Sequence, residues 1–538
     1  MRLTILGGLT ALCLLASACA THPGKIAHVR KASDRAEVTA QVRSGTLRGM
    51  EGAGIRAFLG VPYAAPPTGE LRWRAPRPVE PWSGVRDATR IGADCVQALG
   101  RKAILGGGGG LVFGDEDCLT LNIYAPAGEP DRPRLVMVYL PGGAFTIGAG
   151  ANYDPSRLAA RGRVVVTVNY RLGALGWLAH EDFAADGEGI GGNWGLMDQQ
   201  AALRWVKTNI AAFSGDAGDI TVFAESAGAW SLCSLMTSPA SEGLYDRVIL
   251  QSGTCVEPTS LWSAQEAAES GDGFAASVGC TGADVRACLR RTPAARLAKA
   301  ASKRQGLNGP GSWGPVYGDA LVPLAPPMAL ARGEFVKTPA IVGSNADEGR
   351  LFAVEVRDKA RYDQETVWMY GEAVGPRVLE AYPVEGEAWG LTMARQFTDQ
   401  KFACPADALR RVLARHVPVW GYEFADPDAP IIVPRWLLPY DMGAYHASEV
   451  TSVFGTRWAF ADPGRFTPEQ RALSDRMGDL WTAFGRDGFE RDWPRAGDED
   501  GAVRVFVPGG DRMDPAFAER RRCAFWATTA FGPVVSGS

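Results

Sequence analysis

The stretch VFAESAGAW, residues 222–230, places a serine where it could act as a nucleophile. Ser226 follows the apolar run DITVFA directly, and the helix-like run AWSLCSLM comes soon after it. Its neighbours Ala224, Ala227 and Gly228 are small, as a strained strand-to-helix nucleophile elbow requires. An isolated GxSxG motif is a weak signal, and here Ala224 replaces its first glycine. The alternative interpretation is a structural serine at a turn.

A catalytic serine needs a base, and the base needs an acid to orient it. In elbow-type folds the chain order is serine, acid, histidine. The chain has five histidines, and only His416 and His446 follow Ser226. His416 lies in RRVLARHVPVW, a helix running into a strand, which favours a structural role. His446 lies in the small, loop-like segment MGAYHASEV, as a base on a loop should, so we predict His446 as the base.

The acid should follow a strand between the serine and the histidine. The segment PAIVGSNADEGRLF offers Asp347 and Glu348 side by side, and the pattern alone does not choose between them. An oxyanion hole needs backbone N–H donors. In LVMVYLPGGAF, Gly142, Gly143 and Ala144 follow a strand, and glycine allows the backbone to approach a ligand closely. An ordinary β-turn is the alternative there.

Buried strands must position these residues. Most of the apolar runs that recur along the chain lack polar alternation, which is typical of strands buried on both faces of a mainly parallel sheet. They are LVMVYL (135–140), RVVVTVN (163–169), DITVFA (219–224), RVILQSG (247–253), PAIVGSN (339–345) and VWGYEF (419–424). Between them, residues 198–213 have the apolar periodicity of a helix, with Asp198 near its start where a carboxylate complements the helix dipole. Alternating strands and helices predict an α/β fold.

The composition and the N-terminus limit the possible partners and the cellular location of the protein. The chain has 538 residues, 46% of them hydrophobic, and a net charge of −4, so nothing suggests nucleic acid or an anionic membrane surface as partner. Residues 1–18 resemble an export signal too short to span a bilayer. The segment ASAC resembles a bacterial lipobox with Cys19 as lipid anchor; simple cleavage after Ala18 or Ala20 is the alternative. We assign residues 19–38 to a tether and 39–538 to one catalytic domain.

Cysteines and glycines give further expectations. Of the ten cysteines, Cys13 and Cys19 belong to the signal region. The other eight are an even number in an exported chain, so disulfides are expected, although the count does not give their pairing. The five-glycine run 106–110 is expected to be a surface loop, with a mobile pocket rim as the alternative.

The segment GAGIRA (52–57) fits a dinucleotide motif, but the prolines after it exclude the helix start that such a motif needs.

Three blocks of this sequence resemble the type-B carboxylesterase and cholinesterase family of α/β-hydrolases. They are FLGVPYAAPPTGELRWRAPRP (58–78), EDCLTLNIY (116–124) and the block from GNWGLMDQQ to ESAG (192–228). The resemblance covers nearly all of residues 40–530. It implies an α/β-hydrolase fold, a large central, mostly parallel sheet flanked by helices.

The resemblance also assigns roles to residues. It implies Ser226 as nucleophile, Glu348 rather than Asp347 as acid, and His446 as base. It further implies an oxyanion hole from the N–H groups of Gly143, Ala144 and Ala227, a buried carboxylate at Glu225, and a supporting serine near the acid at Ser252. By similarity it pairs Cys95 with Cys118, Cys280 with Cys288, and Cys404 with Cys523. Cys233 and Cys255 remain, as a fourth bond or as two buried thiols.

Some positions depart from the family pattern. Pro141 stands where the family often has His or Tyr, and Ala144 replaces a third glycine but keeps its N–H. The segment GGGGGLVFGDEDC (106–118) lacks the tryptophan that holds choline in cholinesterases, so choline esters are not expected as substrates. Trp194, Phe145 and Trp458, close to the motifs, could line an apolar acyl site or belong to the core.

The expected activity is hydrolysis of carboxylic esters by two-step acyl transfer, with no metal or organic cofactor. The expected partner is a small-molecule ester, and the membrane is contacted only through a lipid on Cys19. An amidase or lactonase on the same scaffold is one alternative, and a non-catalytic adhesion relative is another. Activity should fall as His446 protonates, near pH 6.5 if its pKa is unperturbed.

Overall fold

The computed structural model describes residues 35–534 apart from 103–106, 188, 304–311, 385, 387, 459–460, 487–488, 490–491 and 499–500. The expected export signal and Cys19 lie outside these residues, and the division into signal, tether and domain stays a prediction. The first strand begins at Ala36, inside the range assigned to the tether. No helix in the described ranges has the length and apolar character needed to cross a membrane.

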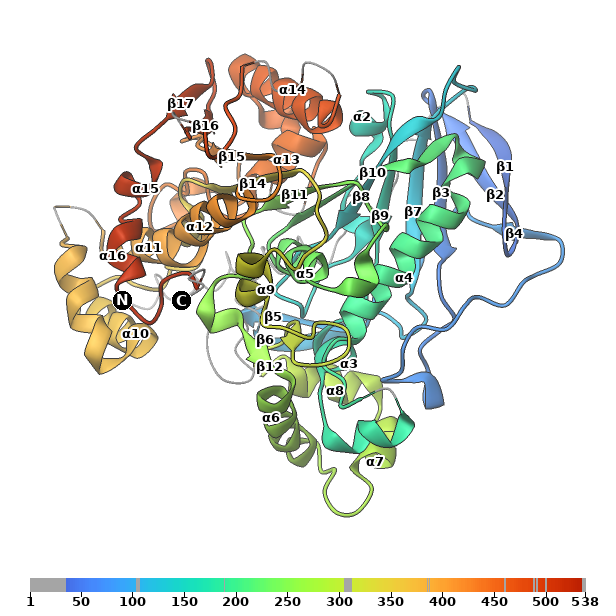
Figure 1. Ribbon diagram of the computed structural model, residues 1–538, viewed down its shortest axis with the longest axis horizontal. Coiled ribbons are helices and arrows are strands. Elements are labelled where there is room, and N and C mark those ends of the chain that lie inside the picture. Colours follow the sequence, from blue (N-terminus) through green and yellow to red (C-terminus); the bar gives the residue numbers. More distant parts are fainter. Residues whose placement is uncertain are drawn as a thin grey trace.

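A 13-stranded sheet runs through the molecule (Figure 1). Its strands, in spatial order, are β1 (Ala36–Val42), β2 (Gly45–Gly52), β3 (Ile55–Pro62), β7 (Thr120–Pro126), β9 (Val164–Val168), β8 (Arg134–Leu140), β10 (Gly215–Glu225), β11 (Arg247–Gln251), β14 (Ala340–Asn345), β15 (Val419–Phe424), β16 (Val503–Phe506) and β17 (Arg512–Asp514), with β4 (Val85–Asp87) beside β2. Neighbours from β9 through β16 are parallel. The pairs nearer both edges are antiparallel, except that β4 runs parallel to β2.

The predicted apolar runs are the central strands. Every residue of β9, β14 and β15 is buried, as expected where helices cover both faces of a parallel sheet. The carboxyl ends of β8, β10 and β14 meet at one edge of the sheet, because parallel strands point the same way. That edge carries the segments predicted to do chemistry.

Helices flank the sheet. They are α2 (Ser156–Ala159), α3 (Gly173–Trp177), α4 (Trp194–Asn209), α5 (Ala227–Met236), α6 (Ala264–Ser277), α7 (Val285–Arg291), α8 (Ala294–Ala301), α9 (Pro326–Arg332), α10 (Lys359–Ala381), α11 (Trp389–Phe397), α12 (Cys404–Leu413), α13 (Ser448–Phe454), α14 (Pro468–Ala483), α15 (Phe517–Arg520) and α16 (Cys523–Ala527). A π-helical turn, η11 (Thr398–Ala403), joins α11 to α12. In Figure 1, α6, α7 and α8 gather at one end of the molecule, away from the red C-terminal strands.

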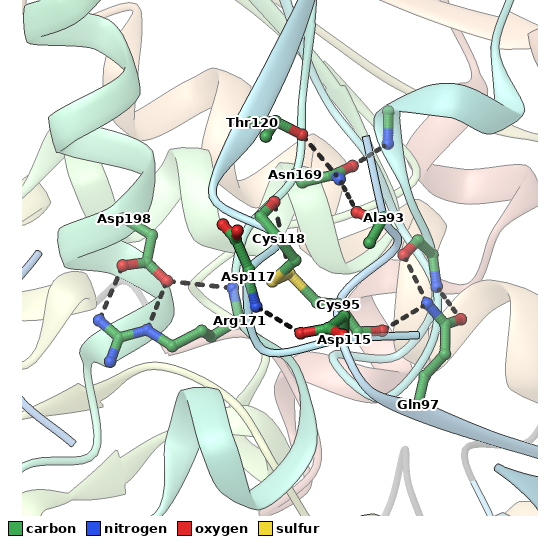
Figure 2. The surroundings of a disulfide bond; sticks show 12 residues. Ala93, Cys95, Gln97, Asp115, Asp117, Cys118, Thr120, Asn169, Arg171 and Asp198 are labelled. Carbon is green, nitrogen blue, oxygen red and sulfur yellow. Dashed lines mark hydrogen bonds and ion pairs between the residues drawn. A yellow bond between two sulfur atoms is a disulfide. The ribbon is translucent and has the colours of Figure 1, made fainter. Parts of the chain in front are cut away.

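Helix α4 begins earlier than predicted, which changes the role of Asp198. The helix starts at Trp194, so Asp198 lies inside it and is fully buried rather than at its N-terminus. Its carboxylate instead faces the Arg171 guanidinium, with Nη2–Oδ1 and Nε–Oδ2 distances of 2.7 and 2.8 Å (Figure 2). This ion pair fastens the segment after β9 to α4.

Four disulfides are present in the described residues. Cys95–Cys118, Cys280–Cys288 and Cys404–Cys523 are the pairs that the resemblance implies. Cys233–Cys255 is the fourth, joining α5 to the segment after β11.

The prediction of a loop for the five-glycine run was wrong for Gly107–Gly110. These residues belong to β6 (Gly107–Phe113), which pairs antiparallel with β5 (Gln97–Lys102). Gly106 lies outside the described residues. The Cys95–Cys118 bond (Figure 2) joins the segments that flank this hairpin. Because glycine has little strand preference of its own, pairing with β5 sets the extended conformation.

Candidate active site

Ser226 sits at a sharp turn between β10 and α5. Its φ of 54° lies in the left-handed region, which costs a non-glycine residue energy and must be held by its surroundings. A Cβ on Gly228 would collide with the Leu140 carbonyl oxygen, and one on Gly253 with the Ser226 carbonyl oxygen. The small residues around Ser226 are therefore required by close packing. Ala224 fits as the fully buried penultimate residue of β10.

His446 joins Ser226 to Glu348. Its Nε2 lies 2.9 Å from Ser226 Oγ, and its Nδ1 lies 2.6 Å from Glu348 Oε2. The other carboxyl oxygen of Glu348 accepts the Asn345 N–H at 2.7 Å, which fixes the carboxyl group against the end of β14. All three side chains are buried, and they come from three different segments of the carboxyl edge.

The two competing residues lie elsewhere. The Asp347 carboxylate accepts the Ala444 N–H at 3.0 Å and pairs with Arg350 at 2.8 Å, so it holds the histidine loop but does not reach the imidazole. His416 is exposed and packs edge-on against Phe335. The geometry therefore favours Glu348 and His446, in agreement with the resemblance.

The turn after β8 is held through its carbonyl groups. The Tyr170 hydroxyl donates to the Pro141 carbonyl at 2.6 Å, and the Gly173 N–H donates to the Phe145 carbonyl at 2.7 Å. Gly143, at φ 119°, accepts two N–H groups from the same turn. In the described part of the chain, no protein group accepts a hydrogen bond from the N–H of Gly143, Ala144 or Ala227. The turn after β8 lies against the elbow, since a Cβ on Gly142 would lie 2.9 Å from Ser226 Cβ.

Two further buried carboxyl groups surround His446. Glu225 Oε1 lies 3.2 Å from His446 Nε2. Glu449, the second residue of α13, accepts hydrogen bonds from the side-chain amides of Gln251 and Asn345 at 3.1 and 2.6 Å. The sequence analysis did not identify Glu449. The sequence shows only that an acidic residue stands three positions after His446. Tyr170 was missed as well, because nothing in the sequence linked it to the turn after β8.

Burial and the charges of neighbouring groups shift the pKa values of these side chains. Burial raises the pKa of Glu225 well above its usual range, and burial with repulsion from Glu348 raises the pKa of Glu449 to about 7. Burial alone would lower the pKa of His446, but Glu225, Glu348 and Glu449 outweigh it and raise it to about 9. The premise of an unperturbed histidine near 6.5 therefore does not hold in the folded protein.

Ser252 lies at the end of β11, with φ 52°, and its N–H donates to the Gly343 carbonyl at 2.9 Å. Within the described ranges its hydroxyl has no hydrogen-bond partner. Its supporting role beside the acid stays a prediction.

A cavity lies beside the elbow. Trp230, one turn after Ser226, and Phe145, next to Ala144, both line it, and their stacked rings have centres 6.1 Å apart. We call this cavity the aromatic pocket. It is lined by Phe145, Trp230, Ser234, Thr254, Cys255, Ser260, Leu261, Trp262, Ser312, Trp313, Gly314, Pro315, Val316, Tyr317, Val322 and Pro326. Of the three aromatics singled out in the sequence, only Phe145 lines it; Trp194 and Trp458 are core residues.

Within the described residues, no group of three or more His, Cys, Asp or Glu side chains is arranged to hold a metal ion.

A mainly parallel sheet with a strand–serine–helix elbow at its carboxyl edge defines the α/β-hydrolase class. The model of the Carboxylesterase family matches residues 36–526. The chain therefore belongs to the carboxylesterase family, and it is a carboxylic ester hydrolase.

Its relatives include proteins named as esterases. The chain is 38% identical over 484 residues to the fumonisin B1 esterase of Sphingopyxis macrogoltabida, covering 86% of this chain and 85% of the relative. It is 34% identical over 460 residues to the para-nitrobenzyl esterase of Bacillus subtilis strain 168, covering 82% and 88%. A solved structure of PNB esterase superposes with a TM-score of 0.74 at 31% identity, covering 90% of this chain and 99% of that one.

Proposed function

We propose that this protein hydrolyses carboxylic esters through an acyl-enzyme on Ser226, with His446 as general base and acid and Glu348 as its orienting partner. The observation that carries the proposal is the His446 ring, which lies within hydrogen-bond distance of both Ser226 Oγ and Glu348. Short, continuous contacts of this kind activate a serine that would otherwise be a poor nucleophile.

The reaction has two halves. Ser226 Oγ attacks the ester carbonyl carbon while its proton moves to His446 Nε2, and Glu348 stabilises the imidazolium. The tetrahedral intermediate collapses, the C–O bond to the alcohol breaks, and the alcohol leaves with the proton from Nε2. Water then attacks the acyl-serine, again giving a proton to Nε2, and Ser226 leaves the carboxylic acid with that proton returned.

The negative oxygen of each tetrahedral intermediate is stabilised by the N–H groups of Gly143, Ala144 and Ala227. Such donors contribute about 10²–10³ in rate each where measured. Because no protein acceptor occupies these N–H groups in the described residues, they are available to the oxyanion.

The aromatic pocket gives a substrate class. Its lining is largely apolar and aromatic, so it suits an apolar group of the ester, which we assign to the acyl side. The named activities of the relatives, on fumonisin B1 and para-nitrobenzyl esters, involve small-molecule esters.

Hydrolysis of p-nitrophenyl esters of increasing acyl length tests the function, with wild type and Ser226→Ala in parallel. We expect turnover in the wild type, loss of at least about 10³-fold in the variant, and fluorophosphonate labelling of Ser226 only in the wild type. Equal turnover in both proteins would contradict the triad. A matched p-nitroanilide series separates esterase from amidase, since an amidase would cleave both.

Export is part of the proposal. The signal-like residues 1–18 and the four disulfides fit an oxidising compartment. We further propose a lipid on Cys19. Metabolic labelling with palmitate in a bacterial host should label the wild type and not Cys19→Ser; labelling of both or of neither would contradict the anchor.

A further inference from the structure

One short segment supplies much of the aromatic pocket. Residues 254–262, here called the pocket wall, leave the sheet after β11 and run to the two-residue strand β12 (Trp262–Ser263). The wall residues that line the cavity are Thr254, Cys255, Ser260, Leu261 and Trp262. Its conformation therefore decides the shape of the pocket.

Glu257, in the middle of the wall, turns away from solvent and is completely buried. Its carboxylate accepts the Ser260 hydroxyl at 2.7 Å, the Thr259 hydroxyl at 2.8 Å and the Thr259 N–H at 3.1 Å. It also accepts the Gln400 side-chain amide at 3.0 Å. The wall thus folds around one carboxylate.

Lys401 is the cation that meets this carboxylate. Its Nζ lies 2.6 Å from Glu257 Oε2, and both side chains are 0% exposed. The same Nζ donates to the Thr259 hydroxyl at 2.6 Å and to the Ser260 hydroxyl at 3.2 Å. It also lies 5.3 Å from the centre of the Trp230 ring, which lines the pocket. All three ammonium donors are therefore directed at the wall.

Lys401 comes from η11, the π-helical turn that also supports the triad. The Thr398 hydroxyl accepts the N–H of Gly349, the residue after Glu348, at 2.9 Å. The Phe402 ring packs against the His446 ring at 4.9 Å. Single π-helical turns are frequent at functional sites because they redirect side chains out of helical register. Here one turn contacts the neighbour of the acid, the base and the pocket wall.

We propose that Lys401 is a positioning residue that determines acyl specificity, by holding the pocket wall in register with the triad. This inference rests on the proposed ester hydrolysis at Ser226. The catalytic atoms do not touch Lys401, so a small acyl group that does not reach the wall is turned over with or without it. A longer acyl group packs against the wall and depends on it. A merely structural ion pair would affect all esters equally.

The test compares p-nitrophenyl acetate with p-nitrophenyl octanoate in Lys401→Met and in the paired Lys401→Met/Glu257→Gln variant, which leaves no unpaired buried charge. We expect kcat/KM for the octanoate relative to the acetate to fall by at least about tenfold, mainly through KM. Thr259→Val, which removes one wall contact of Lys401 without changing the lining, should shift the same ratio in the same direction by less. If the Lys401 variants do not fold, the Thr259→Val variant tests the proposal.

The matched control is Arg410→Met, which removes another buried cation, paired with Asp407 at 2.6 Å and absent from the pocket lining. It should leave the octanoate-to-acetate ratio unchanged. An unchanged ratio in folded Lys401 or Thr259 variants, with normal acetate turnover in the wild type, would overturn this inference alone. Absence of wild-type turnover on both esters would overturn the proposed function instead.

Discussion

Glu225 Oε1 lies 3.2 Å from His446 Nε2, on the same nitrogen that Ser226 Oγ approaches at 2.9 Å. The imidazole therefore has carboxyl groups on both nitrogens, Glu348 on Nδ1 and Glu225 on Nε2. Glu348 is placed to orient the ring through Nδ1. Glu225 competes with the Ser226 hydroxyl for the hydrogen-bonding position at Nε2. This arrangement favours the imidazolium that forms during acyl transfer but makes the resting base harder to deprotonate.

The pH dependence of kcat/KM should follow His446. Neighbouring carboxyl groups raise its pKa to about 9, and only the neutral ring can accept the serine proton. We expect kcat/KM to rise with pH through the neutral range, with a midpoint nearer 9 than 6.5. The measurement is p-nitrophenyl acetate hydrolysis from pH 5 to 10, with Ser226→Ala subtracted for spontaneous hydrolysis. A plateau already reached at pH 7 would contradict this.

Glu225→Gln should move that midpoint to lower pH. The charge of Glu225 is the largest single cause that raises the pKa of His446, while Glu348 acts through both its charge and its hydrogen bond, so the neutral isostere of Glu225 removes a large part of the support of the imidazolium. Glu449→Gln should shift the midpoint in the same direction but less, because its effect is the smallest of the three carboxyl groups. Equal midpoints in wild type and Glu225→Gln would show that Glu225 does not act on the base.

The elbow should tolerate the loss of a methyl group at Ala224 but not the addition of one at Gly228. Gly228→Ala forces a Cβ against the Leu140 carbonyl oxygen and to 2.8 Å from the Pro141 carbonyl oxygen, displacing the serine or the turn after β8. Displacements near 1 Å can cost about 100-fold in rate, so we expect a loss of that order in kcat.

Ala224→Gly is the matched control for the elbow. It restores the usual first glycine of the motif at the cost of about 1 kcal/mol in strand stability. We expect its kcat to stay close to wild type and its unfolding midpoint in urea to fall slightly. A large loss of kcat in Ala224→Gly, or none in Gly228→Ala, would mean that the packing at the elbow does not position the serine.

The central strands and the strand-to-helix turn at Ser226 could be predicted from the sequence because their signals are local. Strands β8, β9, β10, β11, β14 and β15 are continuous apolar runs, and Ser226 sits directly after one of them. The choice of Glu348 over Asp347 needed the family resemblance, because adjacent residues differ only in where the turn after β14 points them.

Other features depend on contacts between distant segments. Lys401 and Gln400 occupy a polar stretch that predicts an exposed surface, yet both are buried against a wall more than a hundred positions earlier. Asp198 was placed at a helix start, because its partner Arg171 lies on another segment. The strand in the glycine run likewise depends on a partner strand, since glycine has little strand preference of its own.

The disulfides should contribute unequally to stability. Cys404–Cys523 spans 119 positions and Cys280–Cys288 spans 8, and in the chain-entropy account a longer loop restrains the unfolded chain more. That account gives about 5 kcal/mol for the longer loop and about 2.5 kcal/mol for the shorter one. We expect the double alanine variant at 404 and 523 to lower the urea midpoint more than the one at 280 and 288. The reverse order would indicate that native contacts, not loop closure, determine how much each disulfide stabilises the fold.

Tyr170 should act on the rate through the turn after β8, which carries two of the proposed oxyanion donors. Its hydroxyl donates to the buried Pro141 carbonyl at 2.6 Å, and Tyr170→Phe leaves that carbonyl without its donor, which typically costs about 1–3 kcal/mol. The turn can then move relative to the elbow, so we expect kcat to fall by about tenfold while KM changes little, as when an interaction specific to the transition state is lost.

Tyr362→Phe controls for the loss of a buried hydroxyl. Tyr362 lies in α10, outside the turn after β8, and donates to the Tyr382 carbonyl at 2.9 Å. Its removal should lower stability and leave kcat close to wild type. If the two variants lose stability alike and neither changes kcat, the Tyr170 hydroxyl only stabilises the fold. If Tyr170→Phe alone lowers kcat, the hydroxyl holds the turn in the position that transition-state stabilisation requires.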